Sequence, residues 1–173
     1  MADRLCTSCV ELLDIDGAAL SVIYDGTVTR SFGASSAVSR ELDELQFTLG
    51  EGPCLDAVRD SVPVLAPDLS DPASQRWPAF AGAAVQRGFR AVLAMPVTVA
   101  SFPIGALDLY RTRPGDLDAA TLAGGLVAAE LAALPLLDLM DIDMDAAAND
   151  DTSTAWDELT VLTRVEVFQA AGM

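Results

Sequence analysis

Short apolar runs separated by turn residues predict four strands arranged as two hairpins. The first pair covers 18–24 and 27–32, and Asp25-Gly26 between them suits a two-residue type I′ turn because glycine accepts a positive φ. The second pair covers 89–99 and 104–111, joined by a short turn. Strands that are paired in this way build an antiparallel sheet.

Apolar residues at helical spacing predict helices before, between and after the hairpins. The clearest helix covers 77–87, where apolar residues recur at i, i+3, i+4 and i+7 and Gly88 supplies a left-handed end. A short strand is expected at 62–66, and Pro63 marks it as an edge strand. Further helices at 3–13, 39–46, 53–60 and 117–134 complete an α+β fold.

The predicted helix at 117–134 is apolar on almost every side, interrupted only by Asp118, Thr121 and Glu130. Such a helix must be buried on more than one face. One face can lie on the sheet, and the other, rich in Ala and Gly, suits the close approach of a second helix. We therefore predict an isologous homodimer built on the terminal helices. The candidate interface residues are Leu5, Leu12, Leu122, Leu126, Ala129 and Ala133.

The charge of the chain limits its partners. Among 173 residues, 26 are acidic and ten are basic, all of them arginine, and histidine is absent, so the formal net charge is −16. Such a field repels phosphate backbones and anionic membrane surfaces. The missing histidine and lysine also remove the commonest metal ligand and Schiff-base chemistry. Nucleic-acid binding by this chain alone and conventional catalysis are therefore not expected.

Residues 120–140 have the length of a membrane span, but they contain Glu130 and Asp138 and have acidic flanks. We interpret them as a buried helix of a soluble protein. No long apolar stretch follows Met1, so no secretory signal is expected. The sequence therefore predicts a cytoplasmic location without membrane contact.

The composition changes at residue 138. Residues 138–155 are rich in aspartate and contain no basic residue, which predicts a flexible, solvated linker, and 156–173 are expected to begin another helix. Asp141-x-Asp143-x-Asp145 imitates the first ligands of a calcium loop. Ala146 and Thr152 stand where that loop needs glycine and glutamate, so a linker is favoured over a calcium site.

Cys6 and Cys9 have the CxxC spacing of a redox motif or half of a zinc site. A structural zinc site needs four ligands, and without histidine only Cys54 remains as a third. Both cysteines also lie on the apolar face of the helix predicted at 3–13, where cysteine behaves as a small apolar residue. We predict that they are structural and that the chain has no metal-binding residues.

Gly50-Glu51-Gly52-Pro53 could be mistaken for a phosphate loop, but it lacks the Walker spacing and the lysine. The first N–H groups of the helix at 53–60 could hold an anion, or the glycines could simply form the turn, which is favoured. Asp108 and Glu130 are lone carboxylates in apolar runs, and Asp108 is expected to face solvent. We predict no catalytic residues.

Four motifs in order, LGEGPCLDAV, APDLSDP, WPAF and RGFRAVLAMPV, resemble the GAF sensor domain of actinobacterial GAF–ANTAR transcription regulators. The likeness spans 4–137 and implies a GAF-like central antiparallel sheet with terminal helices on one face and short helices on the other. In that family the short helices between the hairpins roof the ligand cavity. The resemblance therefore implies these pocket candidates: Cys54, Leu55, Trp77, Phe80, Phe89, Leu93 and Met95.

Members of the GAF family bind small molecules, haem, chromophores or cyclic nucleotides, or bind nothing and only dimerise. The NKFDE-type motif of the cyclic-nucleotide subset is absent here, and without histidine neither haem ligation through His nor a covalently bound bilin is expected. The resemblance therefore implies no particular cofactor, and none is predicted.

The C-terminal stretch TAWDELTVLTRVEVFQAAGM resembles the first helix of a truncated ANTAR domain, an antitermination module that binds RNA hairpins. The resemblance implies a non-enzymatic module that senses a small molecule and dimerises, with RNA bound only through a complete ANTAR domain. Two alternatives stay open. One is a ligand-free dimerisation scaffold, and the other is a redox enzyme of the free-methionine-sulfoxide reductase type, which uses reactive cysteines in and near its pocket.

Overall fold

The computed structural model describes residues 1–24, 27–72 and 76–148. The chain divides into two units, 1–133 and 134–173, and each is described by itself. The Asp25-Gly26 turn and the predicted ANTAR-like helix at 156–173 lie outside the described residues.

The first unit is built on one five-stranded sheet in the order β2-β1-β5-β4-β3, in which every neighbouring pair is antiparallel. This confirms the α+β class with a central antiparallel sheet. The shortest strand, β3, lies at one edge, as Pro63 indicated. The strands are β1 (Gly17–Tyr24), β2 (Thr27–Ala34), β3 (Val64–Ala66), β4 (Ala91–Val99) and β5 (Phe102–Arg111).

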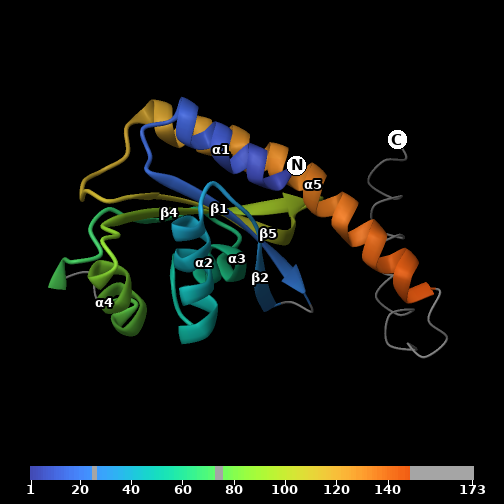
Figure 1. Ribbon diagram of the computed structural model, residues 1–173, viewed down its shortest axis with the longest axis horizontal. Helices are drawn as coiled ribbons and strands as arrows, with labels where there is room; N and C mark the ends of the chain where they lie inside the picture. The colour runs from blue at the N-terminus through green and yellow to red at the C-terminus, as the bar shows by residue number, and fades with distance from the viewer. Residues whose placement is uncertain (25–26, 73–75, 149–173) are drawn as a thin grey trace. The chain divides into compact units, whose positions relative to one another are not determined.

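Helices cover both faces of the sheet (Figure 1). The N-terminal helix and the first half of the last helix lie over one face, and the three short helices lie over the other. The helices are α1 (Ala2–Leu12), α2 (Ala37–Leu49), α3 (Pro53–Asp60), α4 (Pro78–Gln86) and α5 (Ala119–Ala148). We call the two sides the α1/α5 face and the α2–α4 face.

The connection between α2 and α3 has a local cause. Ser36 caps the start of α2 by accepting a hydrogen bond from the backbone N–H of Ser39 at 3.1 Å. Gly50 ends the helix in the left-handed conformation, with φ of 67°. Gly52 has a φ of 151°, and a side chain there would collide with Gln46. Both glycines are therefore required by the turn, which agrees with the interpretation favoured from sequence.

Two expectations differ from the structure. The last helix continues to Ala148 instead of ending near Leu134, so residues 138–148 of the predicted flexible linker are helical. The alanines at 146–148 favour the helical state. Asp108 is not at the surface, because β5 has helices over both of its faces and the side chain is 1% exposed.

Candidate functional site

A group of polar side chains is buried under α2 and α3, within an otherwise apolar core. It combines residues from four separate elements: Ser21 on β1, Asp43 and Gln46 on α2, Cys54 at the start of α3, and Asp108 on β5. All five are 1% exposed or less. We call these five residues the buried polar cluster. Polar groups are rarely placed so deeply without a structural or chemical reason.

Gln46 joins two sides of the buried polar cluster. Its Nε2 donates a hydrogen bond to Oδ2 of Asp108, and its Oε1 accepts one from the backbone N–H of Cys54 at 2.8 Å. The Sγ of Cys54 lies 3.3 Å from Oγ of Ser21, which also donates to the carbonyl of Ala106 at 3.3 Å. Because the Gln46 side chain already occupies the Cys54 N–H, the anion site considered at this helix start is filled from within.

Two carboxyl groups of the buried polar cluster are left incompletely bonded. Neither side-chain oxygen of Asp43 has a hydrogen-bond partner, and neither does Oδ1 of Asp108. Burial is the main cause that raises the pKa of Asp43 to about 7, against a moderating effect of the nearby Ser31 and Ser21 hydroxyls. Burial also raises the pKa of Asp108 well above its ordinary value, and the charge of Asp43 adds to this. The pair therefore holds a proton to a higher pH than two solvent-exposed carboxyls would.

The same residues offer donors for a metal ion. One donor atom each from Asp43, Cys54 and Asp108 lies within 4.8 Å of the others. From sequence we predicted no metal-binding residues, because the chain has no histidine and a zinc site built on Cys6 and Cys9 would have only Cys54 as a third ligand. These three residues are far apart along the chain, and only the folding of α2 and α3 over β5 brings them together. No short-range pattern could have indicated them.

Neighbouring motifs are tied together by hydrogen bonds beside this cluster. Oε1 of Glu51 accepts from the backbone N–H groups of Ala79 and Phe80, at 2.5 and 2.8 Å, and so caps α4. Oδ2 of Asp56 accepts from Nε1 of Trp77 at 2.9 Å. The LGEGPCLDAV and WPAF motifs therefore meet in space, and their acidic residues have structural partners.

The pocket candidates from sequence are divided by the sheet. On the α2–α4 face, Cys54, Trp77, Phe80 and Phe89 belong to one core cluster, and Leu55 packs against it, partly buried. Leu93 and Met95 are also buried, but Met95 points to the opposite face, where a Cβ on Gly125 of α5 would come within 2.7 Å of its Cε. Leu93 is two residues away on the same strand and shares that side. A single cavity cannot be lined by all seven residues.

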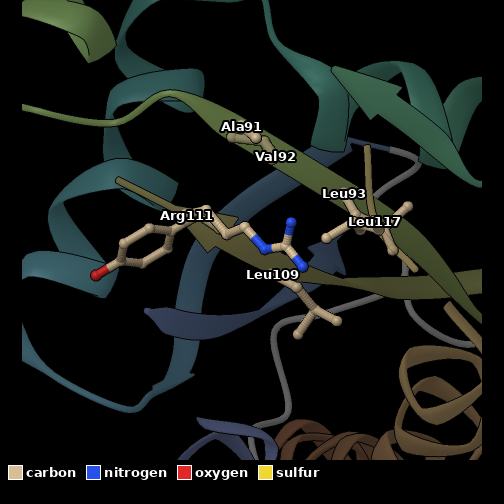
Figure 2. Close-up of a pocket in the computed structure, with 7 residues that line it drawn as sticks. Ala91, Val92, Leu93, Leu109, Arg111 and Leu117 are labelled. Carbon is tan, nitrogen blue, oxygen red and sulfur yellow. The ribbon is translucent and has the colours of Figure 1, made fainter. Parts of the chain in front are cut away.

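In the described part of the first unit, two hollows lie near β4. The first lies between β4, β5 and the loop before α5 and is too narrow for a water molecule (Figure 2). Its lining residues are Ala91, Val92, Leu93, Leu109, Tyr110, Arg111 and Leu117. The second is a groove of about 210 Å³ beside α5, lined by Ser61, Pro63, Met95, Pro96, Thr98, Leu126, Ala129 and Glu130. Neither hollow includes Cys54, Leu55, Trp77, Phe80 or Phe89.

Arg111 fixes the chain segments next to the terminal helices. Its side chain is 6% exposed and forms an ion pair with Asp14 at 3.0 Å, and Nε also donates to the Asp14 carbonyl at 2.6 Å. A third bond, from Nη1 to the carbonyl of Asp116, measures 3.2 Å. The end of β5 thus holds both the segment after α1 and the segment before α5.

The candidate interface residues differ in exposure. Leu12, Leu122 and Leu126 are exposed, and Leu5 and Ala133 are half-buried. Ala129 is only 6% exposed because it faces the core of its own chain, so it would offer little surface to a second copy. Val127 and Leu131, which we did not select from sequence, are exposed. The helical period alone could not show which side of so apolar a helix the sheet would cover.

The CxxC cysteines lie on α1, on the face of the sheet opposite Cys54 (Figure 1). Both are buried and free, as is Cys54. Burial raises the pKa of Cys6 to about 12 and raises that of Cys9 as well. These are the properties of cysteines that pack as small apolar side chains.

One stretch of the described residues, Ala119–Asp138, is long and apolar enough by composition to cross a membrane. Part of it is buried within the protein, and Gly125 brings its backbone close to Met95 and Leu109 of the sheet. A core helix of a soluble protein passes the same test.

Comparison with known proteins identifies the fold. Residues 1–134 match the family model described as GAF domain. A search of the curated proteins finds no match. Many solved structures are similar, with sequence identities that show a shared fold alone.

One such structure is the GAF domain of a two-component sensor histidine kinase from Bacillus halodurans, at 12% identity and a TM-score of 0.59, covering 83% of this chain and 98% of that one. A second is the GAF domain of a phosphoenolpyruvate-protein phosphotransferase from Coxiella burnetii. The identity is 16% and the TM-score 0.63, and the match covers 82% of this chain and 83% of that one. A third is the type II free methionine-R-sulfoxide reductase from Thermoplasma acidophilum. The identity is 20% and the TM-score 0.59, and the match covers 79% of this chain and 89% of that one.

Proposed function

The chain belongs to the GAF domain family, and we propose that it is a cytoplasmic, non-enzymatic sensing and dimerisation module of a transcription antitermination regulator. In this proposal a small ligand is sensed in the first unit, and the terminal helices pass its state to an RNA-binding ANTAR domain. The observation that carries it is the apolar outer surface of α5.

That surface is unusual for a monomer. Among residues 119–133, Glu130 is the only charged residue, and the exposed side of the helix carries large apolar side chains. Burying a Leu or Val side chain stabilises an assembly by about 1.5–3 kcal/mol, so several of them on one helix favour association. The exposed residues are Leu122, Leu126, Val127 and Leu131. A second copy of the same helix offers a surface of the same kind.

Strand β5 supports a path from a bound ligand to this surface. Asp108 points into the buried polar cluster, and the next residue, Leu109, points to α5, where a Cβ on Gly125 would come within 2.9 Å of it. Arg111, at the end of the same strand, holds the segments next to α1 and α5. A shift of β5 caused by ligand binding would therefore be felt at both terminal helices.

The test is the oligomeric state of the full chain. Size-exclusion chromatography with light scattering at micromolar concentration should give a dimer for the wild type and a monomer for Leu131→Glu. Val38→Glu is the matched control, because Val38 is 50% exposed on α2 and Leu131 is 52% exposed. A monomeric wild type, or a dimer unaffected by Leu131→Glu, would overturn the proposal.

An enzyme of the methionine-sulfoxide reductase type is the second candidate, favoured by the fold similarity to the Thermoplasma acidophilum enzyme. The described residues give it little support. Burial raises the pKa of the Cys54 thiol well above its usual value, and Cys6 and Cys9 lie across the sheet from it. Methionine-sulfoxide turnover that is lost in Cys54→Ser would establish the enzyme instead of the sensor.

RNA binding is proposed only for a complete ANTAR domain. The formal charge of −16 repels a phosphate backbone, so the GAF unit would contribute dimerisation and not RNA contacts. If no metabolite stabilises the protein in a thermal-shift screen while the dimer persists, the ligand-free scaffold is favoured over the sensor.

A further inference from the structure

We propose that Asp43, Cys54 and Asp108 form a buried site for one divalent transition-metal ion of the borderline class, for which Zn²⁺ is the probe. This ion would be the ligand of the sensing module proposed above. Only the idea that metal binding acts as a signal rests on that proposed function. Metal binding itself stands on the geometry of the buried polar cluster and can be measured independently of dimerisation.

The unbonded oxygens are the first argument. Asp43 has two buried oxygens without a hydrogen-bond partner and Asp108 has one, and one carboxylate oxygen of each residue lies within 4.8 Å of the Cys54 sulfur. Leaving such groups unpaired in a core costs stability, so natural proteins rarely do so without a reason. Each of these oxygens has a free lone pair, and an ion between the three side chains would use them.

The local charge is the second argument. Two carboxyls and a thiol, all buried, gather here with one donor atom of each within 4.8 Å of the others. Arg40, on the same helix as Asp43, forms no hydrogen bond with that carboxyl. Its guanidinium instead contacts the Ser31 carbonyl at 3.4 Å and the Asp3 carboxylate at 3.5 Å. A divalent cation would supply the missing positive charge.

The donor atoms select the class of ion. A thiolate is a soft donor that Mg²⁺ and Ca²⁺ avoid, and two carboxylates are hard donors that Cu⁺ avoids. One sulfur and two oxygens together suit Zn²⁺, Co²⁺ or Fe²⁺. The Ser21 hydroxyl, 3.3 Å from the Cys54 sulfur, is placed to complete four-coordination.

The distances need only a small adjustment. Ligand atoms about 2.0–2.3 Å from a tetrahedral ion lie roughly 3.3–3.8 Å from one another. The three donor atoms here lie within 4.8 Å of each other, so side-chain rotations that move these atoms by about an ångström would bring them to metal-binding distances. Gln46 holds Asp108 through its side chain and Cys54 through its backbone N–H, in the way that outer-shell residues orient metal ligands.

Binding replaces protons by the ion. The Cys54 thiol loses its proton to solvent as the metal–sulfur bond forms, and the carboxyl pair releases any proton that it holds. No electron is transferred and no other reactant is needed.

The experiment uses the full chain, freed of metal with a chelator and then titrated with Zn²⁺ and with Co²⁺. We expect one ion per chain, a rise in melting temperature with added Zn²⁺, and a cobalt spectrum with thiolate-to-metal charge transfer and tetrahedral d–d bands. Cys54→Ser should abolish the charge-transfer band. Asp108→Asn and Asp43→Asn should each weaken binding more than about tenfold.

Two further variants sharpen the test, one as a control and one that removes the support of the ligands. Cys9→Ser removes a buried thiol on the opposite face and should bind as the wild type does. Gln46→Ala leaves the three ligands in place and should weaken binding about 10–100-fold. Circular dichroism checks that each variant is folded. Should Cys54→Ser fail to fold, the two isosteric Asp→Asn variants carry the test, since they replace incompletely bonded buried carboxyls with neutral amides.

The results separate this proposal from the dimer. Absence of binding, binding without thiolate charge transfer, or charge transfer that is lost in Cys9→Ser but kept in Cys54→Ser would each overturn the metal site. None of these metal-binding results affects whether light scattering finds a dimer. A monomer that binds Zn²⁺ with a Cys54-dependent spectrum would retain the metal site and overturn the dimer.

Discussion

The two faces of the sheet are covered by helices of different character. The α2–α4 face has buried carboxyls, a thiol and an amide in its core, with Gln46 joining Asp108 to the start of α3. The α1/α5 face has an apolar core, and the outer side of α5 is itself apolar. One strand, β5, supplies Asp108 to the first face and Leu109 to the second. Under the proposed function, ligand chemistry and assembly would lie on opposite sides of the sheet and be joined through a shared strand.

The largest expected effect is on the apolar part of the α2–α4 face. Phe80 of α4 is fully buried, so Phe80→Ala should lower the free energy of unfolding by about 3–5 kcal/mol, through lost burial and the cavity it leaves. Urea denaturation measures the change. Val38→Ala, at an exposed position of α2, should change it by less than about 0.5 kcal/mol. Equal effects at the two positions would contradict the packing described for α4.

The next effect concerns pH and the buried carboxyls. The pKa of Asp43 is about 7 in the folded chain against 3.8 as the ordinary value, so between these values the folded state keeps a proton that the unfolded state has lost. The contribution of Asp43 to the free energy of unfolding should therefore fall as pH rises from about 4 to 7, by up to a few kcal/mol, and stay constant above.

Asp43→Asn mimics the protonated carboxyl and should lose this dependence. Measured in chelator, the difference in unfolding free energy between Asp43→Asn and wild type should grow in favour of the variant from pH 4 to pH 7. A difference that is constant with pH, or that shrinks, would show that Asp43 is not buried in the folded chain.

A smaller effect on the free energy of unfolding is expected at Gln46, which holds the buried polar cluster together. Gln46→Leu leaves the Cys54 N–H and the Asp108 carboxyl without their partner, and should cost about 2–3 kcal/mol of unfolding free energy. Thr48→Ala is the control, because Thr48 is exposed on the same helix and bonds only to a carbonyl one turn back. Similar losses in the two variants would argue that Gln46 does not bridge α2, α3 and β5.

The smallest effect is at the start of α2. Ser36→Ala removes the cap of the helix that carries Asp43 and Gln46, and should cost about 1 kcal/mol. Thermal unfolding detects it against Ser8→Ala, an exposed position within α1. An unchanged melting temperature in Ser36→Ala would mean that α2 is held by its packing alone.

Most of the element order could be predicted from sequence, because turn residues and helical periods act locally. The bounds of α3 were predicted to the residue, since Pro53 starts that helix and its glycine turn is unmistakable. The end of α5 was wrong by more than ten residues, because acidic composition suggests a linker even where aspartates can be accommodated on a helix. The alternation of apolar and polar residues along β5 also predicted wrongly that Asp108 faces solvent. Such alternation indicates an exposed face only when one side of the strand is left uncovered.

By itself, the sequence determined the antiparallel hairpins, the short helices, the helix that carries Cys6 and Cys9, and the strongly acidic character of the chain. These follow from local propensity, spacing and composition. Only the tertiary structure decided that Asp43, Cys54 and Asp108 lie together, that Met95 faces away from Cys54, and that Ala129 faces inward. Such facts depend on which strands become neighbours and which faces are covered, and long-range packing sets both.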